Sequence, residues 1–304
     1  MRIVFMGTPD FAVPSLKILI ENNYNVVGVI TAPDKPAGRG LQPRFSPIKK
    51  FAIDNGLRIL QPEKLKSEHF LAELKSLNAD IQIVVAFRML PEIVWNMPPL
   101  GTFNLHASLL PQYRGAAPIN WAIINGEKET GATTFFLQQE IDTGKIIFRE
   151  KLAIRDDETA GQLHDELMIK GAELVLKTVN SIEQKTYTLQ DQSTDAYLKS
   201  APKIFTETCK INFEKPVNEI YNLIRGLSPY PAAFAIYQDK ILKIYRAQKI
   251  EKTHSYLVGE VVTDNKTYFR FAAANGFIEV EELQLEGKKR MSTLDFLNGL
   301  RNKS

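Results

Sequence analysis

The feature that most constrains the fold is an alternation, over the first two-thirds of the chain, of short apolar runs with segments of helical periodicity. The runs at Asn25–Thr31 and Ile81–Phe87 are continuous and rich in β-branched residues, which is typical of parallel strands buried on both faces. Between the runs, segments such as Phe11–Glu21 carry apolar residues at helical spacing, which predicts helices. The sequence therefore predicts an α/β fold with a Rossmann-like, doubly wound parallel sheet, whose ligands bind at the carboxyl ends of the strands.

The same two criteria give the remaining elements of this part of the chain. Strands are expected at Arg2–Met6, Leu57–Leu60, Thr102–Ser108, Ala132–Leu137 and Lys145–Leu152, and helices at Pro47–Asn55, Ser67–Leu77 and Thr159–Ser181. The last two strands have the spacing of a hairpin. The long final helix is expected to close the first domain.

The pattern changes near residue 183, where polar and irregular sequence predicts a linker at 184–203. Short alternating strands separated by turn residues follow it, and about five such strands within roughly a hundred residues predict a small, OB-like β-barrel. We therefore expect domains at 1–183 and 204–304. The elements expected in the second domain are helices at Val217–Arg225 and Ser292–Asn298 and strands at Phe234–Tyr237, Ile241–Ala247, Leu257–Thr263, Tyr268–Ala272 and Phe277–Gln284.

The composition is that of a globular protein, with 44% apolar and 24% charged residues, and its 304 residues suffice for two domains. The single cysteine, Cys209, excludes an internal disulfide and a cysteine-cluster zinc site, which fits a reducing compartment. The first apolar run ends at Gly7 and is too short for a signal peptide, and no later run reaches membrane-spanning length. We expect a cytoplasmic monomer without membrane association or bound metal.

Asn104 and His106 are two residues apart near the end of an expected strand, so their side chains point to the same side. Asp142, in the tripeptide Asp142-Thr143-Gly144, begins a loop that can fold back beside them. An amide and an imidazolium can stabilise an oxyanion, while a carboxylate can orient the imidazole or accept a proton. This set suits acyl transfer to an amine without a covalent nucleophile.

Other interpretations of this region have less support. His106 has no histidine or cysteine at ligand-like spacing, which disfavours a metal site. A lone histidine in an apolar strand is commonly a core residue, but a buried amide beside it favours a use for both. Ser108 does not lie in a G-x-S-x-G nucleophile elbow. The turn at Gly7–Phe11 has one glycine and lacks the dinucleotide fingerprint, which disfavours bound NAD.

Cations gather at two places outside this motif. Arg39 lies between two glycines in a long loop rich in proline and glycine, which is either an ordinary surface loop or a flap that reaches phosphate. Lys288, Lys289 and Arg290 are consecutive beside an expected barrel strand, and Lys203 lies at the end of the linker. Each group alone is typical of a solvated surface, but beside an OB-like barrel they predict a path for a nucleic-acid backbone.

Several motifs resemble those of the folate-dependent formyltransferases. The segments NLHASLLPQYRGAAPINWAIINGE (104–127) and QEIDTGKII (139–147) carry this resemblance. GTPDFAVPSL, DKPAGRG, GLSPYPAAF and LEGKKRMS, spread from residue 7 to residue 292, resemble the members of the family that act on methionine esterified to initiator tRNA. The stretch AFRMLP departs from the usual pattern and is closer to the purine-pathway members.

The resemblance implies that 10-formyltetrahydrofolate is the donor and that the methionine amine attacks the formyl carbon directly. Asn104 and His106 would stabilise the oxyanion, and Asp142 would orient His106 and assist proton removal. The residues that the resemblance places at the folate are Arg88, Met89, Leu90, Ser108, Leu109, Leu110 and Pro111. The residues expected at the tRNA are Arg39, Lys203, Lys288, Lys289 and Arg290.

Two alternatives remain open. One is a formyltransferase that acts on a sugar nucleotide such as UDP-aminoarabinose, which the basic loop and the basic barrel disfavour. The other is a non-catalytic module that binds tRNA or folate, which has no need of Asn104, His106 and Asp142 together.

Overall fold

The computed structural model describes residues 1–37, 42–193 and 197–301, and the chain forms two compact units. Unit 1 comprises Met1–Gly115, Thr130–Leu152 and His164–Ser200, and unit 2 comprises Ala116–Glu129, Ala153–Leu163 and Ala201–Ser304. The units therefore interleave along the sequence, whereas the predicted division is sequential.

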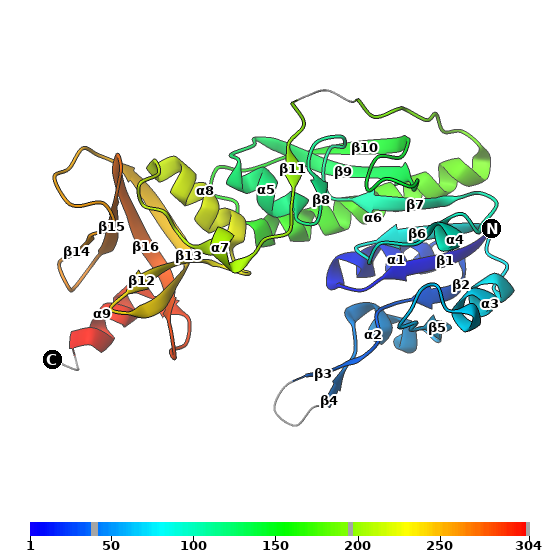
Figure 1. The fold of residues 1–304 in the computed structure, drawn as a ribbon, viewed down its shortest axis with the longest axis horizontal. Coiled ribbons are helices and arrows are strands. Elements are labelled where there is room, and N and C mark those ends of the chain that lie inside the picture. Colours follow the sequence, from blue (N-terminus) through cyan, green and yellow to red (C-terminus); the bar gives the residue numbers. More distant parts are fainter. Residues whose placement is uncertain (38–41, 194–196, 302–304) are drawn as a thin grey trace. The chain divides into compact units, whose positions relative to one another are not determined.

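Unit 1 is built on a seven-stranded sheet with the order β10-β9-β7-β6-β1-β2-β5 (Figure 1). Its strands are β1 (Arg2–Gly7), β2 (Asn25–Ile30), β5 (Ile59–Leu60), β6 (Ile81–Val85), β7 (Thr102–His106), β9 (Glu129–Phe136) and β10 (Ile146–Ala153). β1 pairs in parallel with β2 and β6, and β6 pairs in parallel with β7. β7 and β9 are antiparallel. The predicted Rossmann-like sheet is confirmed, with every side chain of β6 buried.

Two helices of this unit begin at serine caps. α2 (Pro47–Asp54) and α3 (Glu68–Ser76) follow Ser46 and Ser67, whose hydroxyls accept the N–H groups of Lys49 and Phe70. The other helices of this part of the chain are a 3-10 turn at Asp10–Ala12, α1 (Val13–Glu21), α4 (Glu92–Trp95) and α6 (Ala160–Gln184). The long final helix is thus present. In the described part of the chain, no helix has the length and apolar character that crossing a membrane requires.

The loop expected around Arg39 contains a short antiparallel ladder that the sequence did not predict. β3 (Lys35–Ala37) pairs with β4 (Gln42–Arg44), with Pro36 opposite Pro43. Arg39 itself lies outside the described residues. The two short strands β8 (Arg114–Gly115) and β11 (Ser200–Ala201) were likewise not predicted.

Unit 2 contains a curled antiparallel sheet with the order β12-β13-β16-β15-β14, and β17 pairs with β16 (Figure 1). Its strands are β12 (Ala233–Tyr237), β13 (Lys240–Glu251), β14 (Val261–Thr263), β15 (Phe269–Ala273), β16 (Gly276–Leu285) and β17 (Met291–Ser292). Its helices are α5 (Pro118–Ile124), α7 (Thr206–Cys209), α8 (Val217–Leu227) and α9 (Thr293–Arg301). This half-open barrel agrees with the predicted OB-like domain.

The strand predicted at Leu257–Thr263 is shorter in the structure. The N–H of Glu260 donates to the carbonyl of Leu257 at 2.9 Å, and Gly259 has a φ of 84°. These residues form a turn because the left-handed conformation at Gly259 cannot continue a strand. Phe269 lies in the core behind it, with edge-to-face contacts to Phe271 and Phe296 at centroid distances of 5.4 and 5.5 Å.

Candidate active site

Asn104 and His106 occupy β7, the strand between β6 and β9 in the large sheet. Their spacing of two places both side chains on the same face, as predicted. Asn104 is half-buried, and within the described residues no side chain or backbone group hydrogen-bonds its carboxamide. A half-exposed amide at the carboxyl end of a strand is available to a ligand.

His106 is oriented by a backbone carbonyl that the sequence did not reveal. Its Nε2 lies 2.8 Å from the carbonyl oxygen of Tyr113. A carbonyl oxygen can accept but not donate, so Nε2 carries a hydrogen. The neutral form of this imidazole is therefore the Nε2–H tautomer. Nδ1 then faces Asp142, whose Oδ2 is 3.8 Å away. The imidazole and carboxylate side chains are 7% and 13% exposed, so their interaction is weakly screened by water.

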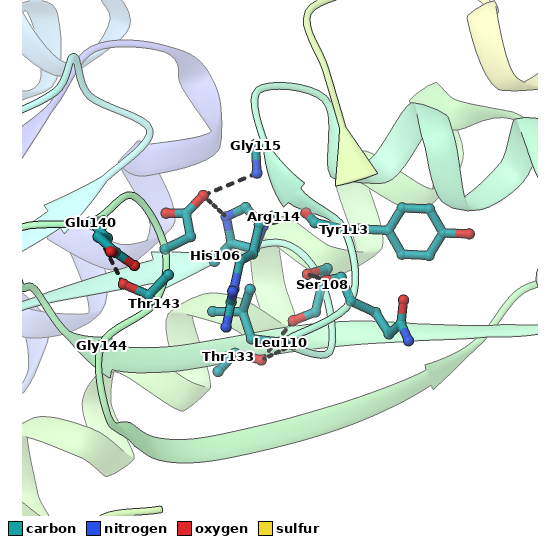
Figure 2. Close-up of polar contacts among 12 residues, drawn as sticks. His106, Ser108, Leu110, Tyr113, Arg114, Gly115, Thr133, Glu140, Thr143 and Gly144 are labelled. Carbon is teal, nitrogen blue, oxygen red and sulfur yellow. Dashed lines mark hydrogen bonds and ion pairs between the residues drawn. The ribbon is translucent and has the colours of Figure 1, made fainter. Parts of the chain in front are cut away.

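Asp142 is held in place by the segment that follows β7 (Figure 2). The backbone N–H of Gly115 donates to Oδ2 of Asp142 at 3.0 Å. Asp142 itself adopts a left-handed backbone with a φ of 55°, a conformation that aspartate tolerates better than most residues. The loop that begins at Asp142 does fold back beside His106, as the sequence suggested.

The glycine of the Asp-Thr-Gly motif is required by packing. A Cβ on Gly144 would lie 1.7 Å from the carbonyl oxygen of Phe136, the last residue of β9. Thr143 stabilises the same loop, because its hydroxyl donates to the carbonyl of Glu140 at 3.0 Å and lies 2.7 Å from Nε2 of Gln138. The motif thus combines a functional carboxylate with the backbone geometry that presents it.

A third segment, predicted as linker, contacts both of these loops. Nε2 of Gln192 donates to the carbonyls of Asp142 and Gly144, each at 2.8 Å. Its Oε1 accepts two hydrogen bonds from the guanidinium of Arg114, at 3.0 and 2.6 Å. Sequence analysis missed Gln192 because no local pattern marks a partner that is about fifty residues or more away along the chain.

The segment after His106 is fixed by internal hydrogen bonds. The hydroxyl of Ser108 is fully buried and donates to the carbonyl of Gln112 at 2.6 Å. Thr133 on β9 donates to the carbonyl of Ser108 at 2.6 Å and accepts the N–H of Leu110 at 3.1 Å (Figure 2). The side chain of Ser108 is therefore used within the protein. Leu109 and Pro111 are half-buried and Leu110 is buried.

The residues after β6 lie at the neighbouring strand end. Arg88 donates to the carbonyls of Glu63, at 2.8 Å, and of Pro62, so its guanidinium is bound within the protein. Met89 is 76% exposed, whereas Leu90 is buried. β6 and β7 are parallel neighbours, so their carboxyl ends lie at the same edge of the sheet. Met89 comes shortly after the end of β6, and His106 is the last residue of β7.

The cations predicted for nucleic-acid binding differ in whether an acidic side chain of the protein already binds them. Lys203, Lys288 and Lys289 are exposed. Arg290 is also exposed, but its guanidinium forms two hydrogen bonds with Glu282, at 2.6 and 2.5 Å, and lies 4.2 Å from the ring centroid of Tyr245. The Glu282 carboxylate largely neutralises Arg290, so the charge of its guanidinium is less available than the charges of the three exposed lysines. In the described ranges, no group of three or more His, Cys, Asp or Glu side chains could hold a metal ion.

Comparisons with known proteins identify the family of this chain. Residues 1–179 match the family model described as formyl transferase, and residues 203–301 match that of the formyl transferase C-terminal domain. The methionyl-tRNA formyltransferase of Bacteroides thetaiotaomicron is 56% identical over 99% of this chain and 96% of its own length. Those of Phocaeicola vulgatus and Flavobacterium johnsoniae are 59% and 56% identical, with the same coverage.

Solved structures share the fold at lower identity. The N-formyltransferase of Helicobacter canadensis, in complex with folinic acid and dTDP-3-aminofucose, has a TM-score of 0.68 at 21% identity and covers 95% of this chain and 99% of its own. HypX of Aquifex aeolicus, in complex with tetrahydrofolic acid, has a TM-score of 0.67 at 17% identity over 98% of this chain and 47% of its own. From the family models and the full-length relatives, this chain belongs to the formyl transferase family, among the methionyl-tRNA formyltransferases.

Proposed function

We propose that this protein transfers the formyl group of 10-formyltetrahydrofolate to the α-amino group of methionine esterified to initiator tRNA. The product is N-formylmethionyl-tRNA for translation initiation. The observation that carries the proposal is the site on β7, where a free amide, an imidazole and a carboxylate lie together in a chain that matches methionyl-tRNA formyltransferases over nearly its whole length. We place the protein in the cytoplasm, where its proposed tRNA substrate is found, and expect it to act as a monomer.

The reaction needs positioning and charge stabilisation more than a strong base. The neutral amine attacks the formyl carbon, a new C–N bond forms, and the bond between that carbon and N10 of the folate breaks. The amine loses a proton, and N10 gains one as tetrahydrofolate leaves. A free α-amino group has a pKa near ~8, so a useful neutral fraction exists near neutral pH.

Asn104 and His106 are proposed to stabilise the oxyanion that forms when the amine attacks. The carboxamide of Asn104 has an N–H donor that no described group uses. A protonated His106 adds positive charge on the same strand face, and its ring orientation is already fixed by the carbonyl of Tyr113. Preorganised donors of this kind are commonly the largest contribution to catalysis of acyl transfer.

Asp142 is proposed to orient His106 and to accept the proton that the amine loses. Its Oδ2 lies 3.8 Å from Nδ1 of His106, so the carboxylate faces the imidazole without a direct hydrogen bond. The N–H of Gly115 fixes the position of the same oxygen. The second carboxylate oxygen remains the better candidate for contact with the amine.

The folate is proposed to lie along the carboxyl ends of β6 and β7. Backbone groups of Arg88, Met89 and Leu90 would contact the pterin, and the segment from Ser108 to Pro111 would line the same site. Because the hydroxyl of Ser108 donates to Gln112, the contribution of Ser108 would come from its backbone.

The tRNA is proposed to contact Arg39 and the basic residues of unit 2. Lys203, Lys288 and Lys289 have exposed ammonium groups that suit phosphate. Arg290 would contribute less because Glu282 already binds it.

The test is transfer of radiolabelled formyl from 10-formyltetrahydrofolate to methionyl initiator tRNA, with UDP-aminoarabinose as a parallel acceptor. Formylation of the tRNA alone supports the proposal. Formylation of the sugar nucleotide alone would replace it with the sugar-nucleotide alternative. Binding of both tRNA and folate without transfer to either acceptor would favour a non-catalytic module.

A further inference from the structure

We propose that Gln192 is a positioning residue of the active site, which holds the Asp142 loop and the Arg114–Gly115 strand in register with each other. The expected loss in kcat rests on the proposed function, whereas the hydrogen bonds of Gln192 do not depend on it. Gln192 belongs to the segment that the sequence predicts as a linker between domains.

The carboxamide of Gln192 uses its full hydrogen-bonding capacity on the two loops. Its Nε2 donates both hydrogens, to the carbonyls of Asp142 and Gly144 at 2.8 Å each. Its Oε1 accepts from Nε and Nη2 of Arg114 at 3.0 and 2.6 Å. An amide oxygen has two lone pairs, so donors and acceptors are both satisfied. A half-buried side chain with four such bonds is strongly ordered.

These bonds lie on either side of the contact that places the catalytic carboxylate. Arg114 precedes Gly115, whose N–H donates to Oδ2 of Asp142 at 3.0 Å. Asp142 has a left-handed φ of 55°, so its side-chain direction depends on a backbone that regular secondary structure does not hold. Gln192 therefore links the residue that donates the hydrogen bond to the one that accepts it. A misplacement of about 1 Å in such a site can cost ~10²-fold in rate.

The backbone of Gln192 is placed independently of its side chain. Gln190 exchanges two backbone hydrogen bonds with Ile146 on β10, at 2.8 and 2.9 Å. Asp191 forms an exposed ion pair with Lys145 at 3.3 Å. Removing the carboxamide of Gln192 should therefore leave the path of the chain intact. Asp191 supplies a matched control, because it is adjacent in sequence, polar and not in contact with Asp142.

The kinetic test compares Gln192→Ala with Asp191→Asn in the full-length protein. We expect Gln192→Ala to lower kcat roughly 10- to 100-fold, with the KM values for folate and tRNA changed less than about threefold. Asp191→Asn should retain the wild-type rate. In an Asp142→Ala background, Gln192→Ala should cost less than about threefold, because the carboxylate it positions is gone. Equal costs in the two backgrounds would overturn the proposal.

A second readout does not require activity. Hydrogen exchange of the Gly115 amide, followed by NMR, reports the bond to Asp142 directly. Exchange should be faster in Gln192→Ala and also in Gln192→Glu, which keeps an acceptor for Arg114 but has no donor for the two carbonyls. It should be unchanged in Asp191→Asn. If the wild-type protein transfers no formyl group, this measurement still tests the geometry, and unchanged exchange in both Gln192 variants would refute it.

Discussion

Nδ1 of His106 and Oδ2 of Asp142 are separated by 3.8 Å, which is too long for a hydrogen bond but within the distance of an ion pair when the imidazole is protonated. The backbone N–H of Gly115 occupies one lone pair of that oxygen. Asp142 therefore does not bind Nδ1 directly, and the Nδ1 hydrogen of a protonated imidazole remains free to be shared with a reacting atom.

Replacing Asn104 with alanine should lower kcat by ~10²–10³, the cost of one oxyanion donor. Because the carboxamide has no partner among the described residues, the fold should be unaffected. The measurement is steady-state formyl transfer, with folate binding and thermal unfolding as controls. A variant with wild-type kcat would remove Asn104 from the mechanism.

Replacing Asp142 with asparagine keeps the shape of the side chain and an acceptor for Gly115 but removes the negative charge. We expect kcat to fall by roughly 10²–10⁴, the usual range for a group that moves a proton. Single-turnover kinetics would separate this loss from weaker binding. If single turnover proceeds at the wild-type rate, the charge has no role in the chemical step.

Replacing Gly144 with alanine should destabilise the protein by about 1–3 kcal/mol, because the new Cβ meets the carbonyl oxygen of Phe136 and forces the backbone to shift. Urea unfolding measures the loss. Gly299 in α9 is a matched control, since a Cβ there meets nothing within 4 Å and alanine favours the helix. Equal stability of the two variants would contradict the packing argument.

Replacing Lys288 and Lys289 together with alanine should weaken tRNA binding and reduce its salt dependence by about one counterion for each lost phosphate contact. Arg290→Ala should have a smaller effect on the slope, because Glu282 already neutralises that guanidinium. Fluorescence anisotropy over a range of salt concentrations provides both slopes. A larger change for Arg290→Ala would reverse this order of importance.

Burial raises the pKa of the Cys209 thiol, which is 3% exposed and donates to the carbonyl of Phe205 at 3.4 Å. A raised pKa leaves less thiolate at a given pH than an exposed cysteine has, so the folded protein should react slowly with a thiol reagent. The reaction should accelerate when urea unfolds unit 2. Rapid modification of the folded protein would show that this part of unit 2 opens easily.

The regular elements could be predicted from sequence because their residues repeat with the period of the structure. The apolar run at Ile81–Phe87 became the fully buried β6, and the spacing of Asn104 and His106 placed both on one face of β7. The position of Asp142 was predicted more loosely, since only its place at the start of a loop was visible.

The parts that sequence did not reveal depend on contacts between distant residues. Gln192 binds Arg114 from 78 positions away, and no periodicity marks such a pair. The carbonyl of Tyr113 orients His106 through the backbone, which any residue type could provide. The β3–β4 ladder pairs a proline with a proline, a composition typical of loops.

The composition of unit 2 bears on how such enzymes can be recombined. Ile124 of α5 packs against the core of unit 2, and Asn120 donates to the carbonyl of Gly226 at 2.7 Å, although both residues are encoded within the first half of the gene. A chimera joined near residue 200 would place a new barrel against an α5 whose side chains pack on the old one. An exchange of the C-terminal part between relatives would therefore have to include α5 as well.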